Sequence, residues 1–228
     1  MLKKALGVVV LCGVSVAAQA VTLDLRHEYV DAGLHGDRAL VSHRFDNGLG
    51  FSLEAKWKSA GTDKDEPFAD LVGSGHEESI NWRWAANKNF ALTPGLNIES
   101  NDSKTIWKPY VHAQYSFDNG IYLAARYRYE YSRYPNTETK NEDDKVNRGD
   151  LWAGFALGDW RTELNYVYAK SQDQIRSNNK NDSYEYNMKV AYKIDKNWAP
   201  YAEVGNVLGS KTTDERQTRY RVGVGYSF

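Results

Sequence analysis

Residues 218–228 read TRYRVGVGYSF and alternate apolar or aromatic side chains with arginine, glycine and serine. Alternation with a period of two is typical of a β-strand, because successive side chains point to opposite faces. One face here is aliphatic and aromatic up to Phe228, and the other begins with Arg219 and Arg221. The pattern predicts a strand that separates an apolar environment from a polar one.

The same alternation recurs along the chain and predicts twelve strands. In LGFSLEAKWK (49–58), leucine, phenylalanine, alanine and tryptophan alternate with serine, glutamate and lysine. In IYLAARYRYEY (121–131), apolar and aromatic residues alternate with arginine and glutamate over most of the segment. An even number of alternating segments is typical of a closed antiparallel barrel of the bacterial outer membrane.

The predicted connections alternate between short and long. DNG at 46–48 and at 118–120 are tight-turn sequences, because Asn-Gly pairs tolerate positive φ. The longest polar connections are 59–74 and 134–147. Short turns at one end and long loops at the other are the arrangement of outer-membrane barrels, with the turns in the periplasm.

The first twenty residues have the features of a signal peptide. Lys3 and Lys4 precede an apolar segment at 5–16, and AQA at 18–20 is a small-x-small cleavage site. We therefore predict a signal peptide at 1–20 and a barrel at 21–228. The only cysteine, Cys12, lies in the apolar segment, so the mature chain is expected to be exported without disulfides.

These features predict an all-β protein, a twelve-stranded antiparallel transmembrane β-barrel in the bacterial outer membrane. Mean hydropathy is −0.67, and beyond residue 20 no apolar run approaches the ~20 residues of a transmembrane helix. A soluble β-sandwich or lipocalin-like barrel has similar alternation. The membrane barrel is favoured by 16 tyrosines and 7 tryptophans, many near strand ends, and by the final phenylalanine, a feature read by the barrel assembly machinery.

The polar face of the strands carries fourteen basic and ten acidic residues. The basic residues are Arg26, Arg38, Arg44, Lys56, Lys58, Arg83, Lys108, Arg126, Arg128, Arg161, Lys189, Lys193, Arg219 and Arg221. All except Lys58 and Lys193 are our candidate pore-lining and substrate-binding residues. A basic lumen concentrates anions and excludes cations, although charges that merely pair to rigidify a small barrel give the same composition.

Twelve strands enclose a narrow lumen, between that of filled eight-stranded barrels and that of wide porins. A slim, flexible polyanion is the solute that suits such a lumen. The predicted inward face also holds four aromatic residues: Tyr110, Tyr122, Trp152 and Tyr201. They are suited either to stacking against sugar rings or to filling space beside the pore, and the sequence does not separate these roles.

Four stretches resemble the KdgM family of oligogalacturonate-specific outer-membrane porins. They are LDLRHEY, DRALVSHRFDNGLGFSLEAKWK, KNWAPYAEVGN and the C-terminal YAEVGNVLGSKTTDERQTRYRVGVGYSF. The resemblance implies a small monomeric barrel whose arginines and lysines line a pore for acidic oligosaccharides from pectin breakdown. By position it assigns the pore lining to Arg26, Arg38, Arg44, Arg126, Arg128, Arg219 and Arg221. A sialic acid channel or a general small-anion channel of the same family is the alternative.

Other classes of function fit the sequence less well. Without Lys3 and Lys4 the net charge changes from −1 to −3, which does not suggest nucleic-acid binding. The outward histidines His27 and His43 have no outward serine beside them, so we predict neither catalytic residues, nor a metal site, nor a cofactor. A structural or adhesive barrel is the alternative of another class. The expected partners are the acidic oligosaccharide, outer-membrane lipid, lipopolysaccharide and the barrel assembly machinery.

Overall fold

The computed structural model describes residues 21–135 and 143–228. The predicted signal peptide at 1–20, and part of the predicted loop at 134–147, lie outside the described residues. The strands are β1 (Thr22–Val30), β2 (Leu34–Arg44), β3 (Leu49–Lys58), β4 (Val72–Trp82), β5 (Trp84–Ala85), β6 (Phe90–Ser100), β7 (Thr105–Ser116), β8 (Ile121–Arg133), β9 (Asp144–Leu157), β10 (Trp160–Ser171), β11 (Asp182–Tyr192), β12 (Trp198–Leu208) and β13 (Arg216–Ser227).

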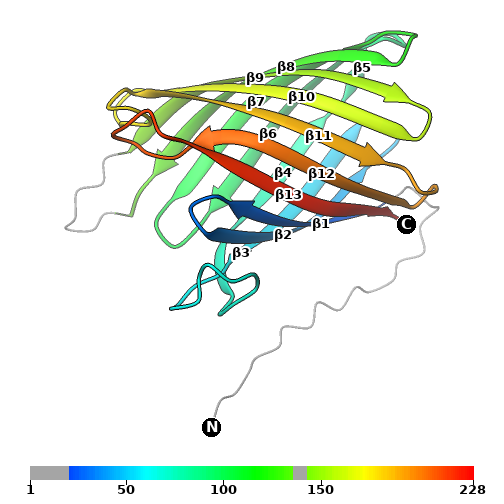
Figure 1. Ribbon diagram of the computed structural model, residues 1–228. Coiled ribbons are helices and arrows are strands. Elements are labelled where there is room, and N and C mark those ends of the chain that lie inside the picture. The colour runs from blue at the N-terminus through cyan, green and yellow to red at the C-terminus, as the bar shows by residue number, and fades with distance from the viewer. Residues whose placement is uncertain (1–20, 136–142) are drawn as a thin grey trace.

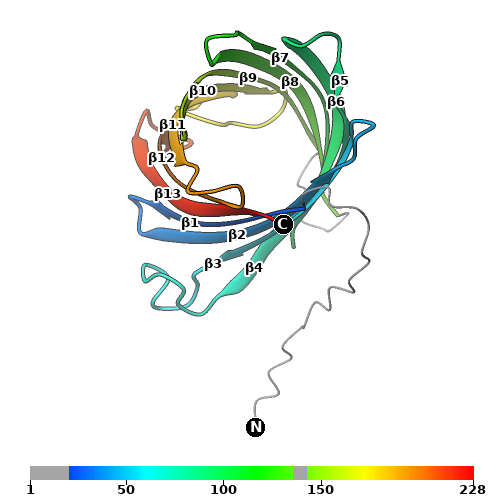
Figure 2. The same ribbon diagram turned by 90° about the vertical axis from the view of Figure 1, so that its right-hand side faces the viewer.

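The strands form one closed antiparallel barrel (Figures 1 and 2). β4 and β5 are one strand interrupted at Arg83, and both pair with β6, so the barrel has the twelve strands that the sequence predicts. The first and last strands close it: Thr22 lies opposite Ser227, and the pairing continues to Val30 opposite Arg219. Closure leaves no unpaired strand edge.

The distribution of side chains is the reverse of that in a soluble domain. Leu53, Leu151 and Val222 are exposed on the outer wall, with exposed fractions of 56%, 56% and 58%. Lys108 and Asp150 are buried at 5% and 1%. Apolar groups outside and ion pairs inside are stable only where the outer solvent is lipid and the interior is polar. Among the described residues, no helix is long and apolar enough to cross a membrane.

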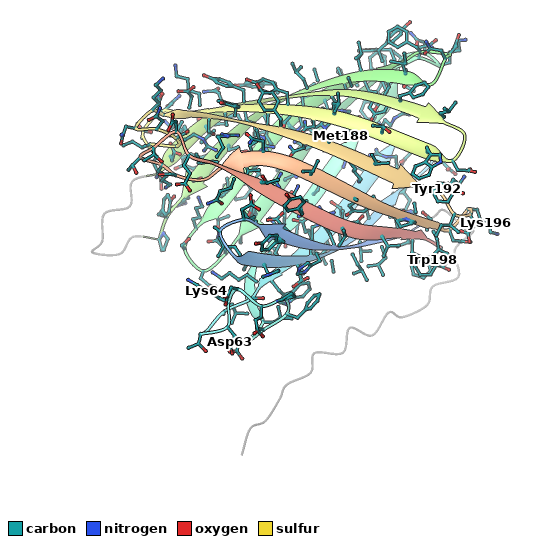
Figure 3. All side chains as sticks on the ribbon, in the orientation of Figure 1. Asp63, Lys64, Met188, Tyr192, Lys196 and Trp198 are labelled. Carbon is teal, nitrogen blue, oxygen red and sulfur yellow. The ribbon has the colours of Figure 1, made fainter. Side chains whose placement is uncertain are left out.

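Aromatic pairs gather at the end of the barrel that carries the short turns. Trp160 packs on Tyr192 with ring centroids 4.7 Å apart, and Trp198 packs on Tyr226 at 4.6 Å. In Figure 3, Tyr192 and Trp198 lie near that end, whereas Met188 lies midway along the wall. Such rings suit the boundary between lipid and water, because each has an apolar body and a polar edge.

The short turns follow the local chemistry that the sequence predicts. Gly48 adopts a φ of 89°, and the Asn47 side chain accepts a hydrogen bond from the Leu49 amide at 3.0 Å. The second DNG turn repeats this arrangement. In the turn between β11 and β12, the amides of Asn197 and Trp198 donate to Asp195 at 2.7 and 2.8 Å, and they hold the pKa of that carboxyl below its ordinary value.

Two long connections are shorter than predicted. β4 begins at Val72 and β9 begins at Asp144, so both strands start inside the predicted loops 59–74 and 134–147. The added strand residues, VGSGHE and DKVNRG, are mostly polar on both faces. Strand ends that project beyond the bilayer need no apolar face, so alternation of hydrophobicity does not reveal them.

The segment 59–71 lies against the outside of the barrel wall rather than in the lumen (Figure 2). His27 Nδ1 is 2.8 Å from Asp37 Oδ1, and His27 Nε2 is 3.1 Å from His35 Nδ1. His35 Nε2 then reaches the carbonyl oxygen of Asp65 at 3.0 Å, and the Phe68 ring packs on His27. The outward-facing histidines therefore hold this loop to β1 and β2, and its described residues leave the lumen free.

Candidate functional site

The lumen wall carries a chain of alternating acidic and basic side chains across neighbouring strands. Arg38 contacts Asp24 at 2.5 Å and Glu54 at 3.2 Å. Lys56 then links Glu54 at 3.2 Å to Glu99 at 3.0 Å. Each of these inward-pointing basic side chains lies between two carboxylates, and such pairs of opposite charge stabilise the sheet. These residues are members of β1, β2, β3 and β6.

Lys108 on β7 ends this chain. Its ammonium is 2.6 Å from Glu77 and also contacts Glu99. The Glu77 carboxylate additionally accepts from the Asn97 amide at 2.5 Å. Lys108 is buried, so its charge is compensated by two carboxylates and contributes little net potential to the lumen.

A second group of charges lies where the first and last strands meet. Arg221 contacts Glu28 at 2.5 Å and Glu203 at 2.7 Å. Arg219 reaches Glu185 at 3.5 Å, and Arg26 reaches Glu28 at 4.0 Å. These contacts join β1, β11, β12 and β13, so they support the seam that closes the barrel.

A third group lies on β8 and β9. Asp150 accepts from Arg126 Nε at 3.1 Å and from Arg148 Nε and Nη2 at 3.0 and 2.8 Å. Arg128 pairs with Glu130 on its own strand. One buried carboxylate therefore holds two guanidinium groups, and the trio keeps a net positive charge.

Four of the predicted pore-lining residues have no carboxylate within 4.0 Å among the residues that the structure describes. They are Arg44, Arg83, Arg161 and Lys189. Arg44 donates to the Gly48 carbonyl and to the Asn81 side chain, both at 2.8 Å. The Lys189 ammonium lies 3.9 Å from the centre of the Tyr201 ring. These cations keep their charge available to a solute.

The four cations line two cavities on the lumen side of the wall. The larger, of about 640 Å³, is bounded by Arg161, Lys189 and residues of the β11–β12 turn. The smaller, of about 330 Å³, is bounded by Arg44, Arg83 and Arg126. An apolar groove of about 650 Å³ lies on the outer wall of β7 to β11 and faces lipid. The two charged cavities, rather than this groove, are suited to an anionic solute.

The four inward aromatic residues take different roles. The Tyr122 hydroxyl donates to Glu163, and the Tyr201 hydroxyl donates to Asp24 at 3.0 Å, so these two rings are tied to the wall. Trp152 borders both charged cavities, and Tyr110 borders the smaller. Of the four, Trp152 is therefore the ring best placed to meet a solute in either cavity.

All twelve candidate pore-lining residues lie on the inward face, eight of them in ion pairs and four without one. Their role in binding a substrate stays a prediction. Sequence reasoning missed Arg148, because the predicted strand began at Asp150. Arg148 lies two residues before Asp150 and therefore on the same face, so the period-two spacing of the two charges, rather than an alternation of hydrophobicity, was the signal that would have found it.

No group of three or more histidine, cysteine, aspartate or glutamate side chains suited to a metal ion occurs in residues 21–135 and 143–228. The outward histidines have structural contacts instead. His27 belongs to the cluster that holds the loop 59–71, and the His43 ring packs edge-on against Phe45 at 4.4 Å.

Comparison with known proteins places these features in context. Residues 14–228 match the model of the family described as oligogalacturonate-specific porin protein (KdgM). The oligogalacturonate-specific porin KdgM of Dickeya dadantii is 41% identical over 225 residues, which cover 94% of each chain. The protein YiiY of Salmonella typhimurium is 40% identical over 212 residues, which cover 92% of each.

A solved structure of the KdgM porin has a TM-score of 0.68 with this chain at 32% identity, and the match covers 91% of this chain and 99% of that one. A second structure, described as KdgM porin in complex with disordered oligogalacturonate, matches at 33% identity with the same TM-score and coverage. The KdgM relatives are described as porins, and the closed twelve-stranded barrel of this chain agrees with the fold of the solved KdgM structures.

Proposed function

The chain belongs to the KdgM family of oligogalacturonate-specific porins of the bacterial outer membrane, and on this premise we propose how its lumen passes oligogalacturonates. The observation that carries the mechanism is the set of cations without carboxylate partners along the two cavities, namely Arg44, Arg83, Arg161 and Lys189. An oligogalacturonate carries a carboxylate on each sugar, so these cations meet a regularly repeated opposite charge along the solute.

The ion-paired residues have a different role in this proposal. Arg126 is an exception, because it shares the single carboxylate of Asp150 with Arg148 and keeps charge available to a solute. Arg26, Arg38, Lys56, Lys108, Arg128, Arg219 and Arg221 shape the wall. Most of their charge is compensated locally, so they do not trap a polyanion. The four unpartnered cations, together with Arg126 beside them, supply the contacts that a passing carboxylate exchanges one for another.

Weak contacts suit this transport. An exposed pair of opposite charges contributes about 0.2–1 kcal/mol in water. Several such contacts raise the concentration of the anion in the lumen without holding it, and conduction requires binding that is weak enough to release the solute. The solute moves down its own gradient, and the proposal needs no cofactor and no catalytic residue.

The remaining expectations are part of the same proposal. We infer that the barrel acts as a monomer, because each chain closes its own lumen, and that the outer wall contacts lipid and lipopolysaccharide. The short turns lie in the periplasm, so the two charged cavities lie near the exit of an inward-moving solute. Recognition by the barrel assembly machinery through the last strand completes the set of expected partners.

The proposal is tested by measuring the reversal potential of the purified barrel in a planar bilayer under a salt gradient, followed by addition of trigalacturonate. Anion selectivity with block of the current by trigalacturonate is the expected result. Anion selectivity with equal block by sialic acid and by simple anions points to the general channel of the same family. Cation selectivity, or no conductance from a folded barrel, overturns the proposal and leaves a structural barrel.

A further inference from the structure

The Arg126 guanidinium lies between two aromatic rings in the smaller cavity. Its central carbon is 5.2 Å from the centre of the Trp152 ring and 5.7 Å from that of Tyr110. Both distances are within the range of a cation–π interaction. The ring of His112 meets Trp152 edge-on, with centroids 5.5 Å apart and planes at 75°. One ring from β7 and one from β9 therefore contact a cation from β8, and His112 of β7 packs against the ring from β9.

The anchoring of Arg126 leaves its outer edge free. Nε donates to Asp150, which is 1% exposed and is shared with Arg148. The two terminal nitrogens of Arg126 donate to no residue within 21–135 or 143–228. A guanidinium fixed at Nε presents Nη1 and Nη2 as a planar fork, and this fork matches the two oxygens of a carboxylate.

The neighbouring Trp152 supplies a contact of another kind. Its indole borders both charged cavities, so it lies where a solute passes from one to the other. A pyranose ring has an apolar face of C–H bonds, whose partial positive charge is attracted to the negative face of an aromatic ring. Tryptophan is suited to this contact, because it is large and is held here by Arg126 and His112.

We propose that Arg126 and Trp152 form a subsite for one uronate residue. The fork of Arg126 binds the sugar carboxylate, and the indole of Trp152 stacks against the sugar ring. Each contact by itself accepts a wide range of solutes, since any small anion meets the first and any neutral sugar meets the second. Only a sugar acid makes both, so the pair selects sugar acids over simple anions. The subsite rests on the proposed function and adds a specific location to it.

The test compares three solutes in the bilayer assay: trigalacturonate, the neutral trisaccharide maltotriose, and the ring-free tricarboxylate citrate. The variant Trp152→Leu removes the stacking surface and changes no charge. We expect the concentration of trigalacturonate for half-maximal block to rise five- to tenfold. We expect block by citrate to change less than twofold and the reversal potential to stay the same. The matched control, Trp107→Leu, removes a tryptophan from the lipid-facing wall. It should leave the block by each solute and the reversal potential unchanged.

Arg126→Lys tests the second contact, because it keeps the charge and loses the fork. It should weaken block by trigalacturonate at least threefold, with anion selectivity retained. Trp152→Phe replaces Trp152→Leu if the latter does not assemble. It should raise the trigalacturonate concentration for half-maximal block by no more than two- to threefold over wild type. An effect of Trp152→Leu on citrate as large as that on trigalacturonate overturns the subsite, as does no effect on either. A wild-type channel that no sugar acid blocks instead removes the proposed function itself.

Discussion

Replacement of Asp150 by asparagine is a direct test of the charge balance in the lumen. Asp150 is 1% exposed, and its two oxygens accept from Arg126 at 3.1 Å and from Arg148 at 2.8 Å. Asparagine has nearly the same shape but no charge. Its amide nitrogen also turns a donor toward guanidinium groups that have only donors to offer.

The size of the effect follows from the burial of the two cations. Removing one partner of a buried ion pair costs about 3–5 kcal/mol, because the remaining charge is left without compensation. The side chains of Arg126 and Arg148 retain exposed fractions of 21% and 27%, so lumen water compensates part of each charge. We therefore expect Asp150→Asn to lower the free energy of unfolding by about 3 kcal/mol, at the lower end of that range.

The assay is urea-dependent unfolding of the barrel in lipid vesicles, read from the fraction that keeps the fast electrophoretic mobility of the folded form. Arg148→Gln in the Asp150→Asn background removes one of the two uncompensated cations. This double variant should recover about half of the lost stability. A double-mutant cycle over the two positions should give a coupling of at least about 1 kcal/mol.

The same variant has an independent readout in conductance. Loss of one negative charge from the lumen should increase anion selectivity and move the reversal potential further toward the equilibrium potential of the anion. A stability loss below about 0.5 kcal/mol together with zero coupling would refute the reasoning. Such a result would mean that lumen water screens these charges as it does those on an open surface.

Three other perturbations test the turn, the wall and the outer loop, and a fourth tests the free cations. Gly48→Ala should cost about 1–3 kcal/mol, since φ is 89° and a Cβ there would lie 2.3 Å from the Arg83 carbonyl oxygen; unchanged urea unfolding would contradict this. Leu53→Lys on the lipid face should cost about 2–4 kcal/mol in the same assay, whereas Ser52→Lys in the lumen should cost much less. His27→Ala should speed hydrogen exchange in the segment 59–71 with the barrel intact, and equal exchange rates would argue against the histidine contact. Arg83→Glu should shift the reversal potential toward that of cations, and a shift in the opposite sense would place Arg83 outside the conducting path.

The sequence predicts which face each strand residue takes, because lipid and lumen make opposite demands on neighbouring positions. A register error of one residue would place Arg219 and Arg221 in lipid and Val222 in the lumen. The structure has the register that avoids this, with Val222 exposed on the outer wall and both arginines in ion pairs. The faces are thus fixed by local chemistry that a single strand contains.

Cross-strand contacts are a different matter, because they depend on how far each strand is shifted along its neighbour. Arg126 lies opposite Asp150, and Arg128 lies opposite Arg148. Nothing within either strand states this shift, so the sequence shows that both strands carry inward charges but not which charges meet. For the same reason it does not predict which lumen cations lack a carboxylate. That distinction separates Arg44 from Arg38, two arginines on one strand with the same predicted face.

The separation between paired and unpaired cations also explains why a channel for polyanions keeps so many acids. Uncompensated cations in the lumen would repel one another and destabilise the barrel. They would also bind a polyanion at many sites at the same time and slow its release. Carboxylates such as Glu99 and Asp150 remove most of that charge and join neighbouring strands through their contacts. What remains is a few cations beside the two cavities. On this reasoning the acids set how loosely a substrate is held, so neutralising one of them should slow the release of an acidic oligosaccharide even where it does not touch the solute.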